Sequence, residues 1–86
     1  MSTLWKHVMT AEQSIAFAEE VARLGYYLKE FKDTDNASIW IVRAYNPGNL
    51  ATPHITWAYN AERNTLFSGN YFQEEKHAIE DFKKRQ

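Results

Sequence analysis

The chain has 86 residues, 44% of them hydrophobic and 15% aromatic, and this composition excludes intrinsic disorder while its length supports one hydrophobic core. Ten basic and eleven acidic residues leave a formal net charge of -1, so no global field draws the molecule onto nucleic acid or an anionic membrane. The absence of cysteine excludes disulfides and thiolate metal sites or nucleophiles.

Residues 1–9 come before the first clear structural signal. Their large apolar side chains are Leu4, Trp5, Val8 and Met9. They fit an N-terminal arm packed on the core, a helical turn or an extra strand, and periodicity does not choose between these. Lys6 and His7 interrupt the apolar stretch that a secretory signal needs, and no apolar run approaches the roughly 20 residues of a membrane span. We therefore expect a cytoplasmic protein with no membrane segment.

The first helix is predicted over residues 10–24. Thr10 and Gln13 have the spacing of a capping box, in which each side chain bonds to the other residue's backbone N–H. Gly25 is well placed to end the helix. At about 100° per residue, one half of the helix surface is apolar, and we expect this half to pack on a sheet. Its members are Ala11, Ile15, Phe17, Ala18, Val21, Ala22 and Leu24.

An antiparallel sheet is predicted over residues 26–68. The expected strands are residues 26–31, 38–45, 54–59 and 65–68, which are rich in β-branched and aromatic residues and are bounded by turn residues. The second strand is apolar on both faces, which is typical of a central strand. Pro47 and Pro53 bound a loop, because proline cannot donate to a strand ladder. This loop is a candidate functional loop.

A second helix is predicted over residues 71–85, with Asn70 as its cap. Acidic residues 74–75 near its start and basic residues 83–85 near its end suit the helix dipole. The sequence therefore predicts an α+β fold. We expect one small two-layer domain over residues 1–86, with an N-terminal helix, a three- to four-stranded antiparallel meander and a C-terminal helix.

The order helix, three strands, helix resembles that of the double-stranded RNA-binding domain. The loop from Pro47 to Pro53 falls between strands where such domains carry a functional loop. That family holds phosphates with a basic cluster at the start of its last helix, whereas this chain has Gln73, Glu74 and Glu75 there. The resemblance therefore implies an order of elements and no RNA-binding residues.

Catalytic and metal-binding signatures are few. The histidines, His7, His54 and His77, fall in three different segments, and none has a second ligand at a metal-binding spacing. Three separated glycines match neither a P-loop nor a dinucleotide fingerprint. His54, which follows Pro53 at the start of a strand, is the best candidate for a general base but has no marked nucleophile partner. We expect no enzyme, no cofactor and no metal.

The aromatic content is more informative. Three Trp, five Tyr and five Phe exceed what one small core readily encloses, so we weigh complete burial of the rings against an aromatic binding face. The expected core aromatics are Phe17, Phe67, Phe72, Phe82 and either Trp40 or Trp57. The candidate partner-binding residues are Arg43, Tyr45, Gly48, Asn49, Leu50, Trp57 and Tyr59. Tyrosine, tryptophan and arginine are the side chains that protein interfaces favour.

These features favour a non-enzymatic module that binds a larger protein. We expect a small accessory or inhibitory factor, of the kind that phages and mobile elements encode, which masks a surface of its larger partner. The alternative is nucleic-acid binding by exposed aromatic rings beside a local basic patch. That patch would consist of Arg43, Arg63, Lys83, Lys84 and Arg85. Both interpretations leave open a homodimer formed through an edge strand or exposed aromatic residues.

Overall fold

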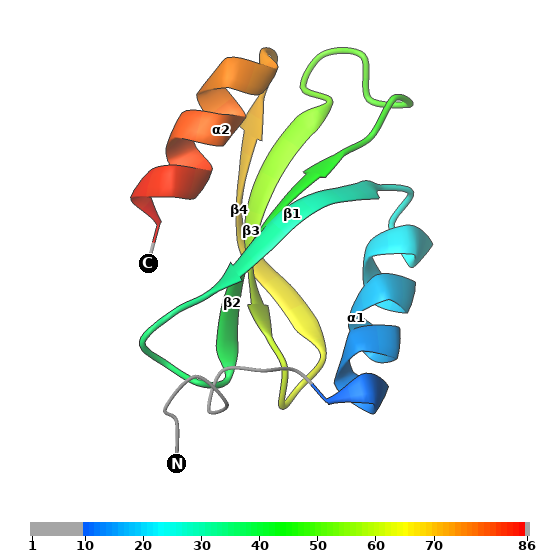
Figure 1. The fold of residues 1–86 in the computed structure, drawn as a ribbon. Coiled ribbons are helices and arrows are strands. Elements are labelled where there is room, and N and C mark those ends of the chain that lie inside the picture. The colour runs from blue at the N-terminus through cyan, green and yellow to red at the C-terminus, as the bar shows by residue number, and fades with distance from the viewer. Residues whose placement is uncertain (1–9, 86) are drawn as a thin grey trace.

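The computed structural model describes residues 10–85, so the segment 1–9 lies outside the described residues. The elements are α1 (Ala11–Arg23), β1 (Tyr27–Asp33), β2 (Ile39–Tyr45), β3 (His54–Asn60), β4 (Thr65–Phe72) and α2 (Glu75–Lys84). The four strands form one antiparallel sheet in the order β1-β2-β3-β4 (Figure 1). The predicted α+β class, the antiparallel meander and the helices before and after it are confirmed. Neither helix within residues 10–85 combines the length and apolarity of a membrane span.

α1 begins where the sequence predicts. The Gln13 N–H donates to Thr10 Oγ1 at 3.1 Å, and the Thr10 N–H donates to Gln13 Oε1 at 2.9 Å, so the capping box is complete. Gly25, just beyond the helix, has a φ of +85°, a left-handed conformation that glycine adopts without strain. Phe17 and Val21, one turn apart, are the buried residues of this helix.

The two helices lie on opposite faces of the sheet (Figure 1). Val42 and Trp57 are cross-strand partners whose side chains belong to the core cluster under α1. The next pair along, Ile41 and Ala58, points the other way and packs with Phe82 of α2. The structure thus differs from the expected two layers. Because β2 and β3 are apolar on both faces, each face needs a cover of its own.

The second helix begins at Glu75 and not at residue 71. β4 continues to Phe72, because its last residues pair with the first residues of β3. Asn70 therefore lies in a strand and is not a helix cap, and Glu74 occupies the N-cap position with no side-chain cap bond. Pairing with β3 satisfies the backbone N–H and C=O groups of the last residues of β4. A helix that began at residue 71 would lose these strand hydrogen bonds, so the strand is favoured over the local capping signal of Asn70.

The observed core matches the expected one in part. Phe17 and Phe82 are buried as predicted. Trp40 and Trp57 are both buried on the α1 face, where the sequence expected only one of them in the core. Phe67 was expected in the core and is instead 43% exposed, because it lies on the edge strand β4, which has a neighbouring strand on one side only.

Candidate functional site

The residues predicted from the sequence to bind a partner do not form one surface. Trp57 and Tyr59 are 6% and 0% exposed, so the expectation that they form an exposed aromatic face is wrong. Arg43 is 8% exposed, and its guanidinium donates to Glu30 at 2.6 Å and to Glu75 at 3.1 Å. These three residues join β2 to β1 and α2. Their role is to hold elements together.

Tyr45 and the loop 48–50 remain accessible at one end of the sheet. The Tyr45 ring is half-buried and lies 5.1 Å from the His54 ring, with the Lys29 ammonium 5.6 Å from its centre. Leu50 is 89% exposed, the highest value among the exposed large apolar side chains. This loop therefore offers one protruding apolar side chain beside a part-covered aromatic pair.

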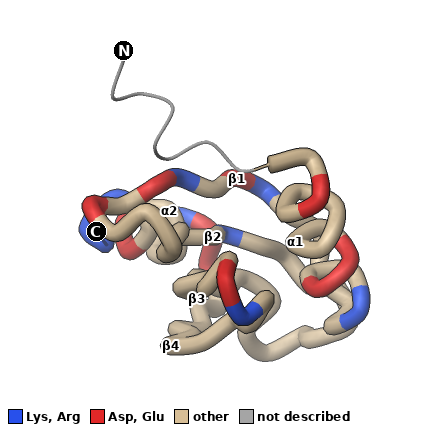
Figure 2. Tube along the Cα trace, turned by 90° about the horizontal axis from the view of Figure 1, so that it is seen from below, with Lys and Arg blue, Asp and Glu red and all other residues tan. Residues whose placement is uncertain are grey.

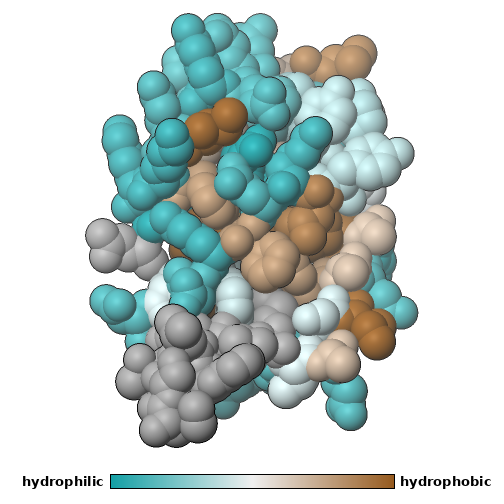
Figure 3. All heavy atoms as spheres, viewed as in Figure 1, coloured by the Kyte–Doolittle hydropathy of each residue, from teal (hydrophilic) through white to brown (hydrophobic). Residues whose placement is uncertain are grey.

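Exposed apolar side chains are concentrated on α1 and β1. Within residues 10–85, eight large apolar side chains are exposed, and five of them lie on α1, at its C-cap or on β1. These five are Ile15, Leu24, Tyr27, Leu28 and Phe31. Figure 3 shows hydrophobic side chains gathered over β1, between the two helices. We define the α1–β1 surface as Ile15, Leu24, Leu28 and Phe31 together with the exposed Ala11, Ala18 and Ala22.

The alanine side of α1 belongs to this surface because the helix turns a narrow stripe toward the sheet. Phe17 points into the core, and Glu20 lies on the side of β3, where its charge acts on Tyr59. At about 100° per residue, Ala18 then projects to the opposite side, toward β1. The sequence assigned the alanine side and Ile15 to the buried half, and this assignment is wrong.

β1 is an edge strand, and no strand of residues 10–85 pairs with its outer side. Its register shifts between Leu28 and Glu30, after which residues 30–33 pair regularly with β2. Leu28 and Phe31 share the α1 face, where the Phe31 ring lies 5.3 Å from the Phe17 ring. Among residues 10–85, no strand covers the outer backbone N–H and C=O groups of residues 30–32, which border the exposed apolar side chains.

The lysines of β1 are held on the α2 side. Lys29 lies over the Tyr45 ring, while Lys32 lies 5.0 Å from the centre of the Phe82 ring and donates to the Lys83 carbonyl at 3.4 Å. Lysines that project along an edge strand discourage pairing with another strand. Here both lysines contact the molecule itself, so this protection is weakened at β1.

The opposite edge, β4, is interrupted in its middle. Ser68 has a φ of +55° at a shift in the register between β3 and β4, which is the geometry of a β-bulge. The Arg85 guanidinium also donates to the Ser68 carbonyl. A bulge bends an edge strand and disrupts its ladder. The register shift of β1 lies near its start, between Leu28 and Glu30, so β1 keeps the longer regular edge of the two.

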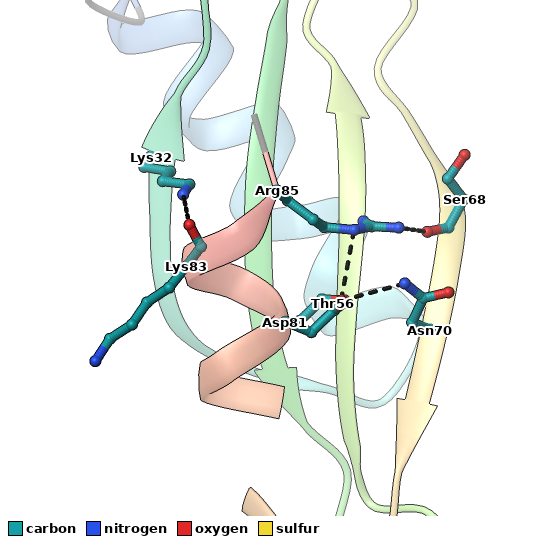
Figure 4. Close-up of polar contacts among 7 residues, drawn as sticks. All are labelled: Lys32, Thr56, Ser68, Asn70, Asp81, Lys83 and Arg85. Carbon is teal, nitrogen blue, oxygen red and sulfur yellow. Dashed lines mark hydrogen bonds and ion pairs between the residues drawn. The ribbon is translucent and has the colours of Figure 1, made fainter. Parts of the chain in front are cut away.

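A polar cluster attaches α2 to the sheet (Figure 4). Thr56 is fully buried and donates to Asp81 Oδ2 at 2.5 Å, and the Asn70 amide donates to the same oxygen at 3.2 Å. Arg85 adds an ion pair to Asp81 at 3.5 Å and the hydrogen bond to Ser68. The cluster joins three elements and holds no histidine, so we assign it a structural role. The sequence contained one signal for it, the i,i+4 spacing of Asp81 and Arg85.

The basic patch of the nucleic-acid alternative is not assembled in the structure. Arg43 and Arg85 are paired with carboxylates, and Arg63 lies in the turn between β3 and β4. Lys83 and Lys84 lie in the last turn of α2. Figure 2 shows acidic positions along α1 and basic positions near the end of α2. Of the five residues expected in the patch, Lys83 and Lys84 are the two that lie close together and have no ion pair with a carboxylate of residues 10–85.

His54, the candidate general base, is half-buried against Tyr45, and its Nδ1 atom is buried with no hydrogen-bond partner. A general base acts on a nucleophile within hydrogen-bond reach, and no hydroxyl of residues 10–85 bonds to this ring. Over the same residues, no group of three or more His, Asp or Glu side chains is arranged to hold a metal ion.

The α2 face carries an apolar hollow of about 460 Å³. It is lined by Thr34, Asp35, Asn36, Ile39, Ile41, Ala58 and Phe67. It adjoins the place where Phe82 of α2 packs on the sheet, because α2 ends before it covers the whole face. This hollow can accept an apolar group, but it has no open strand edge beside an exposed helix as the α1–β1 surface does.

Two ionisable groups near α1 have shifted pKa values. The hydrogen bonds that Arg23 donates to the Glu20 carboxylate lower the pKa of Glu20. Burial raises the pKa of Tyr59, and the negative charge of Glu20 raises it further. The Tyr59 hydroxyl donates to Asn64 Oδ1 at 2.6 Å. These contacts fix α1 and the turn after β3.

No protein-family model matches the chain, and no curated protein or solved structure is significantly similar to it. The resemblance to the double-stranded RNA-binding domain remains one of element order, with a fourth strand before the last helix.

Proposed function

We propose that this chain is a non-enzymatic module that binds a larger protein through the α1–β1 surface and masks the region that it covers. The observation that carries the proposal is that four of the eight exposed large apolar side chains, Ile15, Leu24, Leu28 and Phe31, belong to this surface, beside a strand edge that no strand of residues 10–85 covers. A contiguous apolar patch marks an interaction site, because leaving it in water costs free energy that an interface recovers.

The sequence also favoured a protein-binding module, but the proposed contact lies on other residues than those predicted from the sequence. Trp57 and Tyr59 are interior, and Ile15, Leu28 and Phe31 take their place as candidate anchors. Large apolar side chains at the centre of a contact usually contribute most of its free energy. A small accessory or inhibitory factor, such as those that phages and mobile elements encode, would act by covering its target in this way.

The test is affinity capture with the tagged full-length chain from a lysate of its source organism, with and without nuclease. Wild type is compared with Ile15→Asp and Leu28→Ser, and with Leu50→Asp as a matched change of an exposed apolar residue elsewhere. We expect a stoichiometric, nuclease-resistant protein that wild type and Leu50→Asp retain. Ile15→Asp and Leu28→Ser should lose it while circular dichroism shows an unchanged fold.

The opposite pattern would overturn the proposal. Loss of the partner with Leu50→Asp alone would place the contact on the loop 48–50. Loss of all partners on nuclease treatment would favour the nucleic-acid alternative. Retention of the partner by Ile15→Asp and Leu28→Ser would show that the α1–β1 surface is not the contact.

A further inference from the structure

We infer that the partner binds the α1–β1 surface by strand addition. An extended segment of the partner pairs with the outer edge of β1 and becomes a fifth strand of the sheet. Its apolar side chains face α1, and its acidic side chains face α2. The inference rests on the proposed function and names the partner's chemistry: an extended peptide in which apolar and acidic residues alternate.

The outer edge of β1 is the side of the sheet to which a strand can be added. Residues 30–33 pair regularly with β2 on one side, and no strand of residues 10–85 covers residues 30–32 on the other. An added strand gains main-chain hydrogen bonds along such an edge. Lys29 and Lys32, which would otherwise guard it, are held over the Tyr45 and Phe82 rings. Both edge strands carry a register shift, but that of β1 falls near its start and leaves four successive paired residues, whereas that of β4 falls in its middle and leaves three on either side, so β1 offers the longer regular edge.

On the α1 face, apolar side chains would surround the side chains of an added strand. A strand added to β1 would lie about 4.8 Å from it, with every second side chain on the α1 face. Those side chains would meet Leu28 and Phe31 on one flank and the alanine side of α1 above. Ala18 and Ala22 are exposed and lack the bulk that would exclude a neighbour, so an apolar side chain can approach the helix closely. The alternate positions of the peptide are therefore apolar.

On the α2 face, lysine side chains give the region beside β1 a positive charge. Lys32 lies on that face of β1, beside the last turn of α2 with Lys83 and Lys84. No carboxylate of residues 10–85 forms an ion pair with any of these three lysines. Figure 4 shows Lys32 of β1 beside Lys83 in the last turn of α2. Acidic side chains on the α2 face of the added strand would complement them.

The probe is a synthetic peptide of about eight residues, the length of a typical strand, in which valine or isoleucine alternates with glutamate. It is titrated into the isotope-labelled full-length chain and followed by NMR. One control peptide carries lysine in place of glutamate. Two further controls are N-methylated on alternate residues, one in each frame, because N-methylation removes the N–H donors of one edge. We expect the glutamate peptide to shift and protect the β1 amides, and at least one methylated peptide to lose binding.

Matched variants of the protein test the charge. Lys32→Glu should weaken binding of the glutamate peptide by roughly three- to tenfold, the scale of one exposed charge contact. Lys76→Glu makes the same charge change in the first half of α2, where Lys76 is paired with Glu74 at 3.6 Å, and should leave binding unchanged. Leu28→Ser, which removes a side chain on the α1 face of β1, should weaken binding while the fold remains intact by circular dichroism.

Several outcomes would overturn strand addition. These are equal binding of the glutamate and lysine peptides, full binding of both methylated peptides, or signals confined to elements other than β1. Binding only after removal of residues 1–9 would make the chain's own first segment the occupant, and a dimer formed through β1 in sedimentation would make it a second copy. If no peptide binds the full chain while Ile15→Asp and Leu28→Ser still abolish partner capture, the proposed function stands and strand addition falls. If capture ignores those two changes, the proposed function falls.

Discussion

The indole ring of Trp57 lies against Gly69, so that a Cβ built on the glycine would come within 2.9 Å of Trp57 Nε1 and 3.0 Å of its Cδ1. Gly69 follows the bulge residue Ser68 on the edge strand β4. The ring fills the space that a side chain on this strand would occupy, as aromatic residues do beside strand glycines. One glycine thus allows a core tryptophan to extend over the edge of the sheet.

Gly69→Ala should lower the free energy of unfolding by about 1–3 kcal/mol, because the added methyl forces a packed ring to move. Gly48→Ala is the control. Its nearest neighbour is Asn46 Oδ1 at 3.2 Å, which accepts an exposed hydrogen bond from the Gly48 N–H, so the methyl group disturbs one solvent-exposed contact and we expect a change below about 1 kcal/mol. Urea denaturation followed by tryptophan fluorescence measures both. Equal losses for the two variants would contradict the packing of Trp57 over Gly69.

Tyr59→Phe should reduce stability by about 0.5–1.5 kcal/mol at neutral pH, because it removes the hydrogen bond that the buried hydroxyl donates to Asn64. It should also change the response to alkali. The raised pKa of Tyr59 in the folded state means that its contribution is fully present below about pH 10 and is lost as the pH rises through the folded pKa.

Urea midpoints from pH 7 to above pH 10 test this expectation. The wild-type midpoint should fall at the alkaline end, and the Tyr59→Phe midpoint should fall less. Tyr27→Phe is the control, because Tyr27 is 65% exposed, and it should follow the wild type throughout. Parallel curves for wild type and Tyr59→Phe would show that this hydroxyl does not set the alkaline limit.

Asp81→Ala should cost more stability than Thr56→Val. Asp81 accepts from Thr56 and Asn70 and pairs with Arg85, so its loss leaves the buried Thr56 hydroxyl without its partner and should cost about 2–4 kcal/mol. Thr56→Val removes one donor and keeps the shape of the side chain, so about 1 kcal/mol is expected. In a domain of this size, about 1 kcal/mol corresponds to a shift in Tm of roughly 4–8 °C. A Tm ordered the other way would show that Asp81 does not organise the cluster.

Local signals in the sequence predicted the parts of the fold that depend on neighbouring residues. The Thr10–Gln13 pair predicted the start of α1 because a capping box is complete within four residues. The start of α2 could not be predicted in this way, since Asn70 is a cap by sequence but is paired with Thr56 in the sheet. Competition between a cap and a strand partner about 14 residues away is decided by tertiary structure.

The same limit applies to the candidate site. Trp57 and Tyr59 lie on the same face of a strand, and the sequence pattern alone is compatible with an exposed face. The position of α1 in the structure shows that this face is covered. Conversely, Ile15 lies on the apolar half of a helical wheel, yet α1 buries a stripe centred on Phe17 and leaves Ile15 61% exposed. A helical wheel gives the relative directions of side chains, and their burial depends on how the helix is rotated on the sheet.

Substitutions of Arg43 test whether this residue has a structural role or contacts the partner. Its guanidinium is buried between Glu30 and Glu75, whose side chains are 41% and 49% exposed, so both carboxylates can regain water when the arginine is replaced. Arg43→Met keeps most of the packing of the aliphatic stem, and solvent screens the lost ion pairs, so we expect a loss of about 1 kcal/mol. Arg43→Ala also removes the packed stem and should cost about 2–3 kcal/mol.

Partner capture with the same two variants completes the test. Because the guanidinium faces the interior, Arg43→Met should retain the protein that wild type captures, at a temperature where both are folded. Loss of that protein by a folded Arg43→Met variant would place Arg43 in the contact, as the sequence first suggested, and would extend the interface from β1 across the α2 face. Retention by Arg43→Met together with loss by Ile15→Asp would leave Arg43 out of the contact and keep the α1–β1 surface in it.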